Sequence, residues 1–70
     1  MKHPEPVRER LLHSGRKLFC AHGYDAVSVR KITAHAQANL GAITYHFGSK
    51  AALYHAVIES VAEPFANTVA

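Results

Sequence analysis

Seventy residues are enough for one small domain, and a domain of this size buries only about 60% of the surface that its unfolded chain exposes. Hydrophobic residues make up 49% and charged residues 19% of the chain, a balance typical of a globular domain and not of a disordered segment. No apolar run is long enough to span a membrane, and the first residues lack the apolar stretch of a signal peptide. We therefore expect a cytoplasmic domain without membrane association. An enzyme is not expected, because so short a chain leaves no room for a pocket beside a core.

Charge is unevenly distributed along the chain. Residues 1–50 hold all eight Lys and Arg residues and three of the five acidic residues, whereas residues 51–70 hold two acidic residues and no basic one. The basic part is the candidate for binding an anionic partner. Thirteen of the last twenty residues are hydrophobic, against twenty-one of the first fifty. So apolar a helix usually packs against another part of the protein or against a second copy. We expect the first case, in which this chain is a fragment that a larger body follows, in preference to dimerisation through residues 51–70.

Apolar residues recur at helical spacing, and no alternation typical of a strand lasts beyond four residues. The spacing predicts a first helix over about 6–22, with Pro4 and Pro6 at its start and Gly23 closing it. A glycine inside a helix costs roughly 0.5–1 kcal/mol relative to alanine, so the expected use of Gly15 is the close approach of a neighbouring helix. The apolar stripe of this helix comprises Leu11, Leu12, Leu18 and Phe19.

A second helix is predicted over 28–36, with Ser28 as its N-cap. Lys31 stands where a capping box would have Glu, and Arg30 precedes it. Two cations beside the positive end of a helix dipole are unfavourable by themselves. Their position is understandable if an external anion binds at this helix start. A solvated surface is the alternative interpretation of both side chains.

A third helix is predicted over 40–47, with Asn39 as its cap after a tight link at 37–38. Ile43 and Phe47 are four residues apart and should face inward. The opposite, exposed side then comprises Leu40, Gly41, Thr44 and Tyr45.

Gly48 is expected to end the third helix, and Ser49 to cap a fourth. Pro64 should break or kink this fourth helix, so that 65–70 opens another segment. Its predicted buried stripe comprises Leu53, Val57, Ile58 and Val61. The expected core comprises Leu11, Phe19, Ile32, Ile43, Phe47 and Leu53.

Two short helices joined by a three- or four-residue link, after a longer scaffold helix, describe a helix-turn-helix in an all-α fold. A helix of seven or eight residues fits a DNA major groove, which is about 12 Å wide. Thr44, Tyr45 and His46 carry hydroxyl and imidazole groups for phosphates or base edges. The helix starts at Ser28 and Ser49 can aim backbone amides at phosphates. For Tyr45 and His46, a packing role is the alternative.

These residues also resemble the N-terminal DNA-binding domain of TetR-family transcriptional regulators, over about 6–65. The specific part is the segment Tyr45-His46-Phe47-Gly48-Ser49-Lys50, with Leu53 three residues further on, after the Ser28-Val29-Arg30 helix start. The run from Ala38 to Lys50 is similar to the CecR-like branch of that family. This chain departs from the family in having Thr44 where Tyr is usual, and Gln37 where the turn usually has Gly.

The resemblance implies a three-helix, homeodomain-like head and a fourth helix that leads into a C-terminal body missing from this chain. In such families the body forms the homodimer and binds a small-molecule inducer, which respaces the two heads and releases a palindromic operator in double-stranded DNA. The implied DNA-binding domain is 6–65, with the helix-turn-helix at 28–47, and 66–70 begins the linker or ligand-binding domain. The residues that match the family's DNA contacts are Ser28, Arg30, Asn39, Leu40, Gly41, Ala42, Thr44, Tyr45, His46 and Lys50. Lys31 joins this set because it lies beside a helix start.

Other classes of function have weaker support. A small helical protein-interaction module, with 51–70 as its working surface, is the rival to DNA binding. A hydrolase would need a nucleophile–base pair or paired carboxylates, and neither pattern occurs. Metal and cofactor binding are not expected, since His13, His22, His35, His46 and His55 form no i,i+4 pair and no cluster with Cys or Asp. Cys20 is expected to be a buried, inert thiol.

Overall fold

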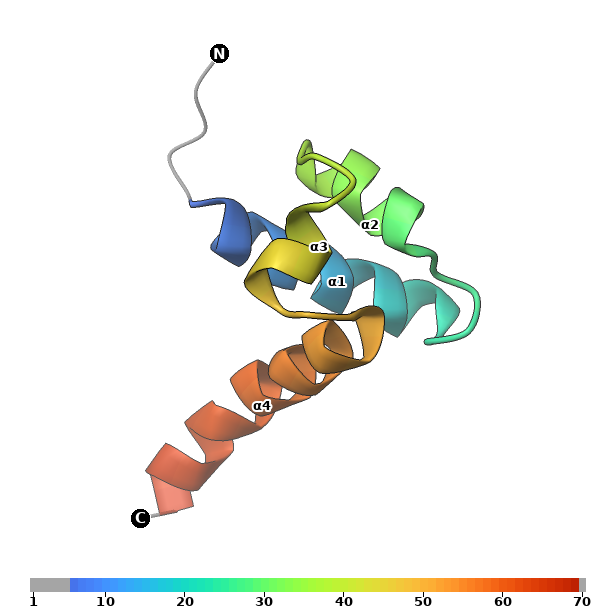
Figure 1. Cartoon of the computed structure of the whole chain (residues 1–70). Helices are drawn as coiled ribbons and strands as arrows, with labels where there is room; N and C mark the ends of the chain where they lie inside the picture. Colours follow the sequence, from blue (N-terminus) through green and yellow to red (C-terminus); the bar gives the residue numbers. More distant parts are fainter. Residues whose placement is uncertain (1–5, 70) are drawn as a thin grey trace.

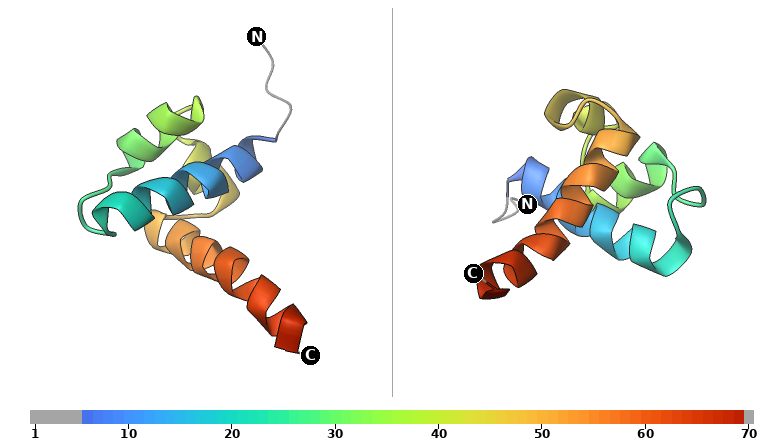
Figure 2. Two further views of the ribbon diagram at one scale, coloured as in Figure 1. Left: turned by 180° about the vertical axis from the view of Figure 1, so that it is seen from behind. Right: turned by 90° about the horizontal axis from the view of Figure 1, so that it is seen from below.

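The computed structural model describes the backbone of residues 6–69 and the side chains of residues 6–62. This part of the chain forms four helices and no strand, which confirms the all-α fold. Helix α1 lies between α2 and α4 and contacts all three of the other helices (Figures 1 and 2). The helices are α1 (Val7–His22), α2 (Val29–Ala36), α3 (Ala42–His46) and α4 (Lys50–Val69).

The bounds of α1 agree with the prediction to within one residue. Pro6 is its N-cap, and Gly23, with a φ of 87°, ends it by donating its amide to the Phe19 carbonyl at 2.8 Å. A positive φ suits glycine because it has no Cβ to clash with the neighbouring carbonyl. The role expected for Pro4 concerns a position outside the described residues.

The core is small and draws on every helix. Five of its six expected members are buried, but Phe47 is only half-buried at the edge, with the Arg8 guanidinium 4.9 Å from its ring centroid. Val27, which lies in the connector before α2, is completely buried and was not expected in the core. The buried hydrophobic residues are Leu11, Phe19, Val27, Ile32, Ala36, Ile43, Leu53 and Val57.

Gly15 is the point at which α4 crosses α1, as the sequence predicted. A Cβ at this position would lie 3.3 Å from Cγ2 of Val57 and 3.5 Å from Cδ2 of Leu53. These distances leave almost no space for a side chain. The absence of a Cβ therefore lets two core residues of α4 pack directly on the α1 backbone.

Two expectations for α4 are wrong. Ile58, expected to be buried, is 47% exposed, and Val61 is exposed as well, because α4 extends away from the other helices beyond its crossing with α1 (Figure 2). The helix also continues past Pro64 to Val69, so Pro64 does not break it and residues 65–69 do not open another segment. A proline removes one backbone donor, and the hydrogen bonds on either side can carry a long helix past it. Ala70 lies outside the described residues.

Cys20 is exposed, and the expectation of a buried thiol is wrong. Successive residues of an α-helix are about 100° apart around its axis, since 3.6 residues complete a turn. Because Phe19 points into the core, Cys20 lies off that face. It borders an apolar groove between α1 and α4, lined by Phe19, Cys20, Tyr54, Val57, Ile58, Val61 and Ala62.

Replacing Gly15 with leucine should lower the free energy of unfolding by about 1–3 kcal/mol, because α4 must move away from α1 to admit the side chain. In a domain of this size, each 1 kcal/mol shifts the melting temperature by roughly 4–8 °C, which thermal unfolding followed by circular dichroism detects. The matched control is Arg16→Leu at the next, exposed position of α1, which should change the melting temperature little. Equal stability of Gly15→Leu and wild type would contradict the close crossing.

Candidate nucleic-acid interface

Helix α2 begins at the predicted serine cap. Ser28 has an extended backbone, and its hydroxyl oxygen accepts a hydrogen bond from the Lys31 amide at 3.1 Å. The first turn holds no acidic residue, while Arg30 and Lys31 are both exposed. This positive helix start therefore faces solvent with two cationic side chains and no carboxylate in the turn to neutralise them.

Helix α3 is shorter than predicted, with five residues in place of 40–47, and Asn39 does not cap it. The Asn39 carbonyl accepts the Ala42 amide at 2.9 Å, which closes a turn and delays the helix start until after Gly41. At the other end, Phe47 leaves the helical region and Gly48 has a φ of 98°. The Gly48 amide donates to the Ile43 carbonyl at 3.1 Å and the Thr44 carbonyl at 3.0 Å, which ends the helix.

The orientation of α3 is as predicted. Ile43 is 1% exposed and anchors the helix in the core, whereas Tyr45 is 84% exposed and Leu40, just before the helix, is 49% exposed. Gly41 and Thr44 are also exposed. The outer side of α3 thus combines a hydroxyl, a phenol and an approachable backbone.

Helix α4 also begins at its predicted cap, because the Ser49 hydroxyl oxygen accepts the Ala52 amide at 3.0 Å. The ammonium of Lys50, the next residue, lies 4.1 Å from the centroid of the Tyr24 ring. Tyr24 in turn contacts Tyr54 with a ring separation of 4.8 Å. The favourable contact between a cation and an aromatic face holds the lysine beside the start of α4.

Tyr24 was not among the residues predicted from the sequence to lie at this site. Its contact with Lys50 joins positions far apart in the chain, so no local pattern could reveal it. Arg10 of α1 was missed for the same reason: its guanidinium donates hydrogen bonds to the carbonyl of Ala36, the last residue of α2, and to that of Gln37, the first residue of the α2–α3 link.

All eleven predicted DNA-contacting residues lie on α2 or its N-cap, on α3, on the link between these two helices or on the first residue of α4, and none is buried. Figure 1 shows α3 beside α2 and the beginning of α4, and α3 contacts both helices. The exposed members are Ser28, Arg30, Lys31, Asn39, Leu40, Gly41, Thr44 and Tyr45, and the half-buried members are Ala42, His46 and Lys50.

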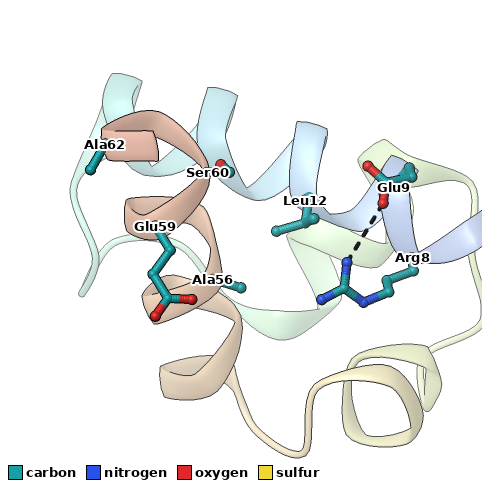
Figure 3. Close-up of a pocket in the computed structure, with 7 residues that line it drawn as sticks. All are labelled: Arg8, Glu9, Leu12, Ala56, Glu59, Ser60 and Ala62. Atoms are coloured by element: carbon teal, nitrogen blue, oxygen red, sulfur yellow. Dashed lines mark ion pairs between the residues drawn. The ribbon is translucent and has the colours of Figure 1, made fainter. Parts of the chain in front are cut away.

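A separate crevice of about 610 Å³ lies between α1 and α4 (Figure 3). Arg8 and Glu9, an ion pair 3.5 Å apart, line it on α1, and Glu59 and Ser60 on α4. The Ser60 hydroxyl donates to the Val57 carbonyl at 2.8 Å. The crevice shares no residue with the predicted DNA-contacting set.

Among the residues that the structure describes, no three His, Cys, Asp or Glu side chains gather in a group that could hold a metal ion. Within the same part of the chain, no helix is both long and apolar enough to cross a membrane.

A short exposed helix, held against three longer helices and preceded by a tight link, is typical of the helix-turn-helix class of DNA-binding transcriptional regulators. Residues 11–57 match the family model described as "Bacterial regulatory proteins, tetR family". The chain belongs to the TetR family.

Curated relatives have names from the same class. The HTH-type transcriptional repressor AcnR of Corynebacterium efficiens is 35% identical over 94% of this chain and 35% of its own length. The HTH-type transcriptional regulator UidR of Escherichia coli is 33% identical over 77% of this chain and 28% of its own length. The HTH-type transcriptional repressor DhaR of Mycobacterium sp. is 33% identical over 91% of this chain and 32% of its own length. The chain thus spans about a third of the length of these relatives. No solved structure matches it.

Ser28→Asp should keep the stability of α2 while weakening DNA binding. Aspartate caps a helix about as well as serine, but its charge opposes a phosphate at the same helix start. Ser28→Ala removes the cap and should cost about 1 kcal/mol. Chemical unfolding and titration of labelled duplex measure the two effects. Undiminished DNA binding by the aspartate variant would rule out a phosphate at this helix start.

Proposed function

We propose that this chain is the operator-binding head of a transcriptional repressor that acts as a homodimer and responds to a small-molecule inducer. The names of AcnR and DhaR, both transcriptional repressors, support repression as the mode of action. In this proposal the function is regulatory and not enzymatic, and the protein works in the cytoplasm, where its DNA lies. Membership of the CecR-like branch stays a prediction from the sequence.

The proposed mechanism is the insertion of α3 into the major groove. The observation that carries it is the opposite exposure of two residues in one short helix: Ile43 is buried and Tyr45 is 84% exposed. Thr44 and Tyr45 can then hydrogen-bond to base edges or phosphates. The exposed Gly41 lets the backbone come close to the DNA, and the Leu40 side chain can contact the methyl group of thymine.

Phosphate contacts on either side of α3 would fix its register on the duplex. The start of α2 offers backbone amides together with Arg30 and Lys31, and the start of α4 offers amides together with Lys50. Such contacts supply affinity without reading sequence, whereas the α3 side chains supply specificity. Asn39, Ala42 and His46 are proposed as further contacts at the edges of α3.

Dimerisation and induction are assigned to a C-terminal body outside these seventy residues. The proposed boundary follows residue 65, and 66–70 would begin the connection to that body. A dimer would present two copies of α3 to half-sites of a palindrome about 34 Å apart, or a multiple of that distance.

The rival function, a protein-interaction module, draws on the exposed Ile58 and Val61 of α4. Apart from Lys50 at the start of α4, the proposed DNA-contacting residues lie outside that helix, and the two properties can coexist in one chain. The family match over 11–57 favours DNA binding as the main function.

The seventy-residue chain should bind DNA weakly and with strong salt dependence. One head reads one half-site, so its dissociation constant should lie near the non-specific range of about 10⁻⁴–10⁻⁶ M. Neutralised phosphates release counterions, so the affinity should fall as salt rises. Fluorescence anisotropy of labelled duplex between 50 and 200 mM salt, a range over which counterion release has a large effect, measures this slope. An affinity independent of salt would refute the phosphate contacts.

Substitutions should separate specificity from affinity. Thr44→Ala with Tyr45→Ala should abolish the preference for a selected sequence over a scrambled one, with little change in stability, since both side chains are exposed. Lys50→Ala should weaken both duplexes alike and reduce the salt slope by about one. Competition binding with the two duplexes compares the variants. Full preference in the double variant would contradict base reading by α3.

A further inference from the structure

We propose that Arg10 is a positioning residue for DNA recognition: it holds the α2–α3 turn, residues 37–41, in the geometry that presents α3 to the groove. The inference rests on the proposed function. The Arg10 Nε donates to the Ala36 carbonyl at 3.0 Å, and its Nη2 donates to the Gln37 carbonyl at 3.0 Å. One guanidinium on α1 thus binds two successive carbonyls at the end of α2.

The backbone hydrogen bonds within the turn use other acceptors than these two carbonyls. The Ala38 amide donates to Thr33 at 2.9 Å, and the Gln37 amide to Ala34 at 3.2 Å, the paired bonds of a Schellman motif. That motif satisfies carbonyls inside α2 and leaves those of Ala36 and Gln37 to another donor. The planar fork of an arginine matches two neighbouring acceptors, and its charge lies at the negative end of the α2 dipole.

The left-handed residue of this turn is not glycine, so the turn carries backbone strain in addition to the two carbonyls that Arg10 binds. Gln37 has a φ of 56°, and among the described residues it is the only non-glycine with a positive φ. An L side chain is strained in this region by contact between its Cβ and the backbone. The two Arg10 hydrogen bonds therefore stabilise a conformation that the residue itself disfavours.

A movement of the turn would change the position and tilt of α3. Only five residues separate Ala36 from Ala42, and the Asn39 carbonyl in the turn accepts the first amide of α3. Helix α3 is five residues long with a single buried residue, Ile43, so its own packing leaves its tilt weakly fixed. Arg10 precedes the fully buried Leu11, so the core of α1 holds its backbone in place.

A purely structural role would lower stability and, through it, DNA binding, so the test uses variants of matched stability. Arg10→Met keeps a long apolar stem and removes both donors. Gln37→Gly removes the strain of the left-handed conformation and should restore stability in the Arg10→Met background. Glycine adds backbone freedom and no contact with α1, so it should leave the orientation of the turn unfixed once Arg10 is replaced. Arg10→Lys keeps the positive charge but cannot bond both carbonyls in the same fork. Arg16→Met controls for the loss of an exposed α1 arginine.

The measured quantity is sequence preference: the ratio of dissociation constants for a scrambled duplex and for one that the wild-type chain selects from a randomised pool. Binding is measured at a temperature at which circular dichroism shows every variant folded. We expect the Arg10→Met, Gln37→Gly double variant to lose roughly tenfold in preference. Arg10→Lys should also lose preference while keeping the wild-type salt slope, because its charge is retained. Gln37→Gly alone and Arg16→Met should keep the wild-type ratio.

Hydrogen exchange gives a second readout. In the double variant the Ala38 and Ala42 amides, which bond within or next to the turn, should exchange faster than in wild type. The Leu53 amide of α4 should be unchanged. Wild-type preference in the double variant would overturn the positioning role and leave Arg10 a stabilising residue only. A wild-type chain that selects no sequence would instead overturn the proposed function, and the positioning role with it.

Discussion

A helix of five residues cannot maintain itself in water, because the first helical turn fixes several backbone angles for a single hydrogen bond. Helix α3 has this length, so its conformation depends on what surrounds it. Ile43 secures it to the core, a turn precedes it, and Gly48 closes it. The longer helices hold this short one in place. Helix α1 provides a surface on which α3 packs, and α2 and α4, which precede and follow α3 in the sequence, also contact it.

The same dependence explains where the glycines and serines lie. Gly15 lets α4, which begins only a few residues after α3, pack directly on α1. Ser28 and Ser49 begin the helices on either side of α3, and each satisfies one backbone amide of the first turn. Amides of those turns remain without partners inside the helix, and this leaves both helix starts suited to phosphate. Capping thus serves folding and the proposed DNA contacts together.

The two halves of α4 have different surroundings. Leu53 and Val57 are buried against α1, whereas Ile58 and Val61 are exposed beyond the crossing. Together with Cys20 and Tyr54 they border an apolar groove. A domain of this size has few buried residues to stabilise it. Apolar side chains that stay in water contribute no burial free energy, and a body that covered them would add that stabilisation. The C-terminal body of the proposed function would supply such a cover, and the chain spans about a third of the length of its curated relatives.

The sequence by itself determined the helical class, the first two helix starts, the serine caps, the role of Gly15 and the outward side of α3, because spacing, capping chemistry and the missing Cβ act locally. It could not determine how long α3 is, that Val27 is buried in a connector, that Cys20 and Ile58 are exposed, or that α4 continues past Pro64. Those features depend on where the other helices lie. The contacts of Arg10 with the turn and of Lys50 with Tyr24 were decided by the tertiary structure alone, since each joins residues 26 or more positions apart. A side chain meets a distant backbone carbonyl or ring only once packing has brought the two helices together.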